Sequence, residues 1–129
     1  MSTLDSAQER SSDKVPHRPQ ELDAYVDHFL SLVCDTSRRY ILELLSIQNT
    51  TSGDAVLPER RSGDIARAIG LSAATTSEHL RQLAQAGLVT SRREGNTVYY
   101  QLRNHLLVKA FQDLLDALDD DFSLRSQSK

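Results

Sequence analysis

Apolar residues recur at helical spacing near both ends of the chain. Over residues 20–34 they fall every three or four positions, which predicts an amphipathic helix after Pro19. Residues 104–120 show the same spacing, with an apolar arc wider than one contact in a small domain needs. A large exposed apolar face is typical of a subunit interface. We therefore expect these two helices to join two copies of the chain.

A further helix is predicted over residues 36–46. Either Asp35 or Thr36 can begin it, because both side chains accept a hydrogen bond from a free N–H group of a first helical turn. The inner face expected from the spacing consists of Tyr40, Ile41, Leu44 and Leu45.

Residues 63–69 and 73–86 predict two helices joined by a tight turn. Ser62 and Ser72 are expected to cap their first turns, and Gly70 can adopt the left-handed conformation that ends the first helix. The buried positions expected are Ile65, Ala66 and Ile69 in the first helix and Ala73, Thr76, Leu80, Leu83 and Ala84 in the second.

Strand-like segments follow at residues 88–94 and 97–102, separated by Gly95-Asn96, a strong two-residue hairpin signal. The core face expected from this register consists of Val89, Val98, Tyr100 and Leu102. A helix, a turn, a second helix and a hairpin, in this order, form a winged helix-turn-helix. The predicted fold class is therefore mainly α with a small β-hairpin: four helices, two strands and a last helix, paired as a homodimer through the first and last helices.

Composition divides the chain into a central domain and polar ends. The division expected is a flexible N-terminal tail at 1–19, a domain at 20–121 with the helix-turn-helix at 62–86 and the wing at 88–102, and a C-terminal tail at 122–129. Residues 48–61 are polar and contain Gly53 and Pro58, which predicts a long loop that we interpret as an insertion.

The hydrophobic content of 39% and the charged content of 26% are typical of a soluble domain. The sequence has no apolar run of the ~20 residues that a membrane span needs, and its first residues lack the apolar core of a secretory signal. Cys34 is its only cysteine, which excludes an internal disulfide and suits a reducing compartment. We therefore expect a cytoplasmic protein without a membrane partner.

The net charge of −3 argues against a nucleic-acid partner, but the charges are unevenly spread. Residues 60–103 carry seven arginines against three acidic residues, a balance of +4, whereas 104–121 carry one lysine against five aspartates, a balance of −4. Because screening limits the reach of a charge to about 8–10 Å, a phosphate backbone responds to the local field. The basic centre is compatible with DNA.

Three pieces of the chain resemble the ArsR/SmtB family of bacterial winged-helix transcriptional repressors. They are CDTSRRYILELL at 34–45, GDIARAIGLSAATTSEHLRQLAQAGLV at 63–89 and REGNTVYYQL at 93–102. The resemblance covers about residues 22–120. It implies a homodimer whose two recognition helices read a palindromic operator in double-stranded DNA, with half-sites about one helical turn, ~34–36 Å, apart.

The candidate DNA-binding residues lie on the outward face of the 73–86 helix and on the hairpin. Small polar side chains there let the helix approach base edges, and arginines can reach phosphates. The candidates are Ala74, Thr75, Ser77, Glu78, His79, Arg81, Arg92, Arg93 and Asn96. The resemblance assigns base edges to Thr75, Ser77, Glu78 and His79, and phosphates to Arg81, Arg92 and Arg93. An acidic Glu78 either accepts a hydrogen bond from cytosine N4 or disfavours non-specific binding.

Metal ions release many members of this family from DNA, but the ligand positions are changed here. The helix that carries a thiolate pair in some members has no cysteine, and the positions of the last-helix site hold Asn104, Leu106, Ala117 and Asp120. We therefore expect no metal at the usual sites and no cofactor, and the effector is unknown. Cys34 is expected to be a small buried apolar residue. Together with His28 and His105 it leaves open a metal-responsive repressor with a non-standard site.

Two other classes of function compete with this interpretation. An enzyme is not expected, because the sequence has no phosphate-binding glycine loop, nucleophile elbow or metal-ligand cluster with a general base. A winged-helix module that dimerises or binds protein without reading DNA remains an alternative, since Glu78 and the acidic total charge favour it. Repression and activation are not distinguished by the sequence.

Overall fold

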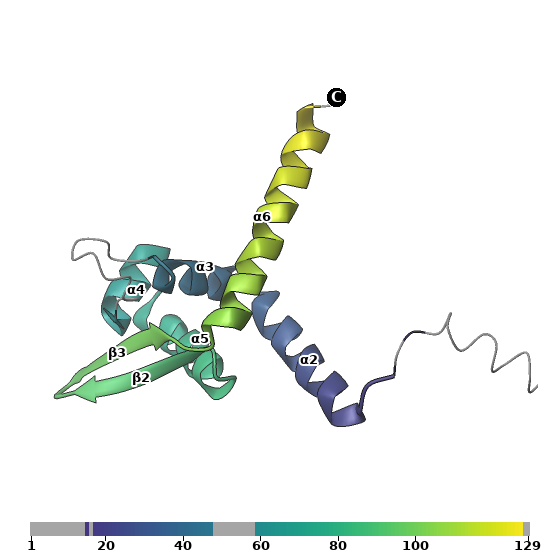
Figure 1. Cartoon of the computed structure of the whole chain (residues 1–129). Coiled ribbons are helices and arrows are strands. Elements are labelled where there is room, and N and C mark those ends of the chain that lie inside the picture. The colour runs from purple at the N-terminus through teal and green to yellow at the C-terminus, as the bar shows by residue number, and fades with distance from the viewer. Residues whose placement is uncertain (1–14, 16, 48–58, 128–129) are drawn as a thin grey trace, which may run out of the picture.

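The computed structural model describes residues 15, 17–47 and 59–127 (Figure 1). Its elements, in chain order, are α2 (Gln20–Val33), α3 (Thr36–Leu45), β1 (Arg60–Arg61), α4 (Ser62–Ile69), α5 (Ala73–Gln85), β2 (Val89–Glu94), β3 (Thr97–Leu102) and α6 (His105–Gln127). The predicted tail at 1–19, apart from its last residues, and most of the predicted 48–61 loop lie outside the described residues. Within these residues, no helix combines the length and apolar composition that a bilayer crossing needs.

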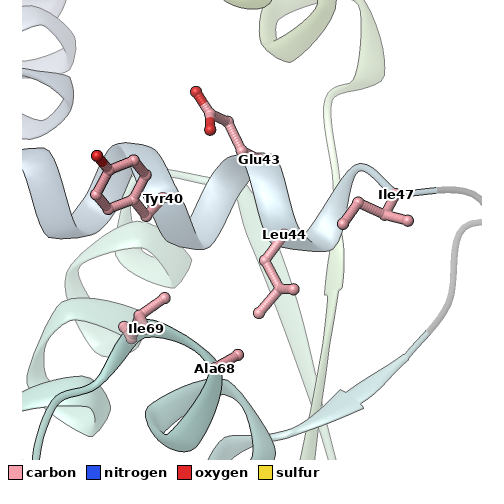
Figure 2. Close-up of a pocket in the computed structure, with 6 residues that line it drawn as sticks. All are labelled: Tyr40, Glu43, Leu44, Ile47, Ala68 and Ile69. Carbon is pink, nitrogen blue, oxygen red and sulfur yellow. The ribbon is translucent and has the colours of Figure 1, made fainter.

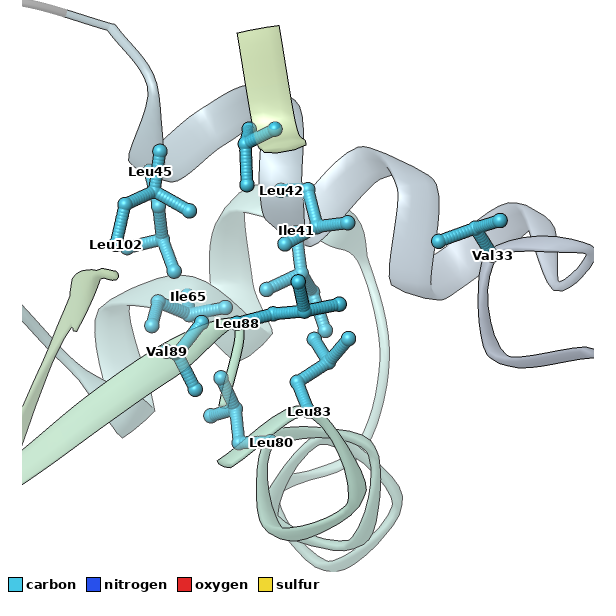
Figure 3. Close-up of a cluster of buried hydrophobic side chains, with 11 residues drawn as sticks. Val33, Ile41, Leu42, Leu45, Ile65, Leu80, Leu83, Leu88, Val89 and Leu102 are labelled. Carbon is cyan, nitrogen blue, oxygen red and sulfur yellow. The ribbon is translucent and has the colours of Figure 1, made fainter. Parts of the chain in front are cut away.

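The core lies where α3, α4, α5 and the base of the hairpin meet (Figure 3). Its largest fully buried side chains are Ile41, Leu42, Leu45, Ile65, Leu80, Leu83, Leu88 and Val89, together with Thr76. Each helix contributes residues three or four positions apart, which is the spacing that places side chains on one helical face. This core fixes α5 and the hairpin to the same body.

Local signals in the sequence set most helix ends. Asp35 caps α3, since its carboxylate accepts a hydrogen bond from the Arg38 backbone N–H at 3.0 Å. Ser72 caps α5 in the same way through the Thr75 N–H, and Gly70 ends α4 with a φ of 74°. The predicted cap at Ser62 is wrong: Ser62 is the first residue of α4, and no side-chain cap bond is formed there.

The antiparallel hairpin has the predicted register, with Val89 opposite Leu102 and Arg93 opposite Val98. A third strand, β1, was not predicted. Arg60 and Arg61 belong to the 48–61 segment, which was predicted to be a loop. They instead pair with Tyr100 and Tyr99 of β3. The sheet order is β1-β3-β2, so β3 is the central strand.

Two expected core positions are wrong. Tyr40 of α3 is 56% exposed, and its place in the core is taken by Leu42. Ala73, the first residue of α5, is also exposed. Tyr40 instead borders an open groove of about 550 Å³ between α3 and α4. In this groove Leu44 of α3 points toward the part of α4 that carries Ala68 and Ile69 (Figure 2).

The last helix is longer than the sequence predicted. Asn104 precedes it with a φ of 59°, and its side-chain oxygen accepts a hydrogen bond from the Leu107 N–H at 3.3 Å, as a helix cap does. The predicted end at Asp120 is wrong, and so is the predicted C-terminal tail for residues 122–127, because α6 continues to Gln127. Figure 1 shows α6 and α2 extending from the core in different directions.

Candidate nucleic-acid interface

Helix α5 presents a polar face opposite its buried stripe. Thr76, Leu80 and Leu83 are buried, so the residues between them point away from the core. The candidates Ala74, Thr75, Ser77, Glu78 and Arg81 are all exposed, and His79 at the edge of this face is half-buried. The first two turns therefore carry small side chains on an open surface. Such a surface suits close approach to a base-pair edge.

Glu78 and Arg81 form an ion pair on the exposed face of α5. Arg81 Nε donates to Glu78 Oε2 at 2.9 Å, and Gln82 Nε2 donates to Glu78 Oε1 at 3.1 Å. The hydrogen bond from Arg81 lowers the pKa of Glu78 to about 2, with Gln82 adding to the effect. Glu78 is thus ionised at neutral pH, and its charge offsets that of the arginine predicted to reach a phosphate.

His79 contacts α3 as well as bordering the polar face. Its Nδ1 atom lies 3.3 Å from an Arg38 guanidinium nitrogen. Because arginine has only donors, the contact is a hydrogen bond when Nδ1 is the acceptor and the ring carries its proton on Nε2. The side chain assigned to a base edge is therefore also tied to the helix behind α5.

The two wing arginines lie on opposite faces of the hairpin. Arg92 is opposite Tyr99 in the ladder, and its guanidinium carbon lies 4.6 Å from the Tyr99 ring centre, within cation–π range. It also donates to Glu59 at 3.0 Å and to Glu94 at 2.7 Å. These side-chain bonds raise the pKa of Arg92 further above its ordinary value, and the bond from Arg92 lowers that of Glu59. Two carboxylates thus neutralise Arg92.

Arg93 has a different environment from its neighbour. It is exposed, lies opposite Val98, and forms no ion pair with any residue in the described part of the chain. Asn96 is exposed at the hairpin tip. Figure 1 shows this tip projecting from the helical body. Arg93 therefore offers an unneutralised positive charge near the end of the wing.

The tip of the hairpin lies beside the first turn of α4. A shallow hollow of about 320 Å³ there is lined by Arg61, Gly63, Arg67, Asn96 and their neighbours. Arg61 and Arg67 both pair with Asp64, and these bonds lower the pKa of the Asp64 carboxyl. Two arginines share one carboxylate, so this corner keeps a net positive charge.

The residues left open for a metal do not come together. Cys34 follows α2 and is exposed, so the expectation that it is buried is wrong. The His105 ring lies 3.3 Å from the Leu102 carbonyl oxygen, and His28 borders a small hollow with Tyr25. Across residues 15, 17–47 and 59–127, no three His, Cys, Asp or Glu side chains form a group that could hold a metal ion.

Two parts of this surface have no signal in the sequence. Glu59 and Tyr99 contact Arg92, and Arg38 contacts His79. In the sequence, Glu59 and Arg92 are 33 residues apart. Arg38 and His79 are 41 residues apart. No local pattern predicts bonds over such distances along the chain. The pairing of β1 with β3, which brings Glu59 to the hairpin, carried no sequence signal either.

Comparisons with known proteins agree with the geometry. The sequence pattern of the bacterial regulatory proteins of the arsR family matches residues 58–91. The arsenical resistance operon repressor of Staphylococcus aureus is 33% identical over 85 residues, which are 66% of this chain and 72% of the relative. The nodulation protein NolR of Rhizobium meliloti is 29% identical over 113 residues, 88% of this chain and 84% of the relative.

A solved structure agrees as well. The homodimeric winged helix-turn-helix DNA-binding domain of a possible ArsR-family transcriptional regulator from Mycobacterium bovis superposes with a TM-score of 0.62. It is 26% identical, and the match covers 84% of this chain and 92% of that one. The fold and the exposed face of α5 together define a winged helix-turn-helix protein. The chain belongs to the arsR family of bacterial regulatory proteins.

Proposed function

We propose that this chain is a dimeric transcriptional repressor that reads double-stranded DNA with α5 and contacts its backbone with the wing. The observation that carries the proposal is the exposed polar face of α5, capped by Ser72 and held on the core by Leu80 and Leu83. A recognition helix needs both a rigid attachment and small outward side chains to enter a major groove. Family membership supports the same function.

The proposed dimer forms through α2 and α6. These helices carry the largest group of exposed apolar side chains in the described chain: Leu22, Tyr25, Val26 and Leu30 on α2, and Leu106, Leu114, Leu118, Phe122 and Leu124 on α6. Exposed apolar surface on that scale favours association. Two copies related by a two-fold axis present two α5 helices, which matches a palindromic operator with half-sites about one turn, ~34–36 Å, apart.

Within each half-site we assign different roles to the candidate residues. Thr75 and Ser77, with Ala74 leaving room beside them, contact base edges. Arg93 contacts a phosphate. Arg92 contacts a phosphate only if it gives up its ion pair with Glu59 or Glu94. Because Glu78 is ionised and paired with Arg81, it weakens attraction to phosphates in general, which favours specific over non-specific binding.

The proposed place of action is the cytoplasm, and the releasing effector is of unknown chemistry. At the positions of the family's last-helix metal site, Leu106 and Ala117 offer no donor atom for a metal ion. This supports an effector other than a metal ion bound at that site. Zinc, nickel or cobalt at micromolar levels should leave the affinity for DNA unchanged. A large metal-induced loss of affinity would show instead that Cys34, His28 or His105 forms a non-standard site.

The test is selection of duplexes by the purified chain from a pool of randomised DNA. The proposal expects enrichment of an inverted repeat with half-site centres about 10 base pairs apart, bound by two chains per duplex. A pool that stays random after repeated rounds would overturn specific reading and favour the protein-binding alternative. Enrichment of a single half-site bound by one chain would overturn the dimer.

A further inference from the structure

Arg38 is the point where α2, α3 and α5 are joined by hydrogen bonds. It belongs to the first turn of α3, and its Nε donates to the Leu32 carbonyl in the last turn of α2 at 2.7 Å. A terminal nitrogen of the same guanidinium donates to Gln82 Oε1 of α5 at 2.8 Å and lies 3.3 Å from His79 Nδ1. One side chain therefore contacts the end of one helix and the inner edge of another.

The bonds continue from Gln82 to the DNA-facing side of α5. Gln82 uses its oxygen for Arg38 and its Nε2 for Glu78, at 3.1 Å, and Glu78 in turn accepts from Arg81. The Arg38–Gln82 bond orients the amide, since the carboxamide oxygen faces the guanidinium and the nitrogen faces the carboxylate. A continuous polar chain thus runs from the last turn of α2 to Glu78.

Arginine suits this position because of its shape. Its planar guanidinium holds several N–H donors at fixed angles, so bonds to α2 and α5 can form together without further ordering. A lysine carries the same charge on one nitrogen at the end of a flexible stem. It can donate to either helix, but it does not reproduce the rigid fork.

We propose that Arg38 is a positioning residue that sets the orientation of α5 relative to α2. This inference rests on the proposed function, because α2 belongs to the proposed dimer interface and α5 to the DNA-reading surface. The orientation of α5 on α2 then fixes how the two recognition helices of a dimer are placed on successive half-sites. Small changes at the end of α2 reach Glu78 and Arg81 through the same bonds.

Arg39 provides a matched control. It is the next residue of α3, has the same charge, and also binds the end of α2, since it donates to the Val33 carbonyl at 3.0 Å. Its second bond goes to Thr36 of its own helix, at 3.2 Å, and not to α5. Replacing Arg39 therefore tests the loss of a bond to α2, whereas replacing Arg38 also removes the link to α5.

The experiment compares Arg38→Lys, Arg39→Lys and Gln82→Met with the unaltered chain. Affinity is measured for a duplex enriched by the unaltered chain and for a scrambled duplex of the same composition. Arg38→Lys and Gln82→Met should each lower the affinity for the enriched duplex about tenfold. This is the loss expected when a hydrogen bond to a charged group is removed. The affinity for the scrambled duplex should fall much less. The salt dependence of Arg38→Lys should not change, because its charge is kept.

Two further results decide the proposal. The double variant Arg38→Lys/Gln82→Met should lose no more than the worse single variant, because each single variant already lacks the Arg38–Gln82 bond. Without DNA, amide hydrogen exchange over Ala73–Gln85 should be faster in Arg38→Lys and Gln82→Met than in Arg39→Lys. Additive losses, an equal loss in Arg39→Lys, or unchanged exchange in α5 would overturn it. If the unaltered chain enriches no duplex, the proposed function fails, and the exchange comparison still decides the role of Arg38.

Discussion

Arg92 and Glu59 form an ion pair across the central strand of the sheet, with 3.0 Å between Arg92 Nε and Glu59 Oε2. Glu59 immediately precedes β1, whereas Arg92 is in β2, and the pair spans Tyr99 of β3. Arg92, which the sequence marked together with Arg93 as a DNA contact, is thus held by the protein's own carboxylates. Its neighbour Arg93 is the arginine of this pair that is available to a phosphate.

The two wing arginines should therefore differ when each is replaced by glutamine. Loss of one phosphate contact lowers the slope of log affinity against log salt by about 0.9. Because two chains bind each duplex in the proposed complex, Arg93→Gln removes two contacts and should lower the slope by about 1.8 on any duplex. Arg92→Gln should show a clearly smaller fall, since Glu59 and Glu94 already offset its charge. Salt titrations of both variants check this. A larger effect of Arg92→Gln would contradict the assignment.

Replacing Leu118 by aspartate should break the proposed dimer. Leu118 is 55% exposed in the single chain and belongs to the α6 surface assigned to the proposed dimer. Two leucines are lost per dimer, at about 1.5–3 kcal/mol each, so the dimer dissociation constant should rise by about a hundredfold or more. Sedimentation equilibrium measures this. The control is Ser123→Asp, which puts the same charge on the polar side of α6. Equal effects of both variants would place the interface elsewhere.

Two glycines near α4 should respond to alanine in opposite directions. Gly70 has a φ of 74° and no neighbouring atom within 4 Å of an added Cβ, so Gly70→Ala adds backbone strain of about 1–2 kcal/mol. Gly63 is the second residue of α4, and an added Cβ there meets only the end of Arg67 at 3.9 Å. Gly63→Ala should therefore raise the free energy of unfolding by about 0.5–1 kcal/mol. Urea unfolding of both variants checks this, and a destabilised Gly63→Ala would contradict the assigned helix.

Asp35 should stabilise the fold more at neutral pH than in acid. The hydrogen bond from the Arg38 backbone N–H, helped by the Arg38 charge, lowers the pKa of Asp35 below its ordinary value of 3.8. A carboxyl whose pKa is lowered by folding contributes stability above its unfolded pKa and loses it as the pH falls through the folded one. Asp35→Ala should cost about 1 kcal/mol at pH 7, the value of a helix cap.

The difference in unfolding free energy between Asp35→Ala and the unaltered chain should then shrink below about pH 4. Asp35→Asn keeps an acceptor oxygen without the charge, so it should lie between the two at pH 7 and respond less to pH. A difference that is the same at pH 7 and pH 3 would show that the ionised carboxylate does not provide the stabilisation.

The sequence predicted the elements whose signals are local. Ser72, Gly70 and the Gly95-Asn96 turn have fixed positional preferences in caps and hairpins, and the structure has each where it was expected. The end of α6 was not predicted because no local signal marks it. The stretch after Asp120 is mostly polar, with Phe122 and Leu124 as its apolar residues, and it contains no glycine or proline to stop a helix. An Asp121–Arg125 bond supports the added turns.

The features that the sequence did not reveal depend on contacts between distant residues. β1 has two residues, too few for an alternating pattern, and exists because Tyr99 and Tyr100 pair with it. Tyr40 fits the helical spacing of an inner face, but the side of α3 that carries Leu42 meets the core instead. The role of Arg38 follows from bonds to α5 that no local motif encodes.

The most direct test of DNA reading is the affinity of the unaltered chain for its enriched duplex and for a scrambled duplex as salt is raised. For a sequence-reading regulator, log affinity for both duplexes should fall linearly with log salt concentration. The enriched duplex should bind at least about 10³-fold more tightly than the scrambled one at each salt concentration. Affinity that does not change with salt, or that is equal for the two duplexes, would contradict a sequence-reading regulator.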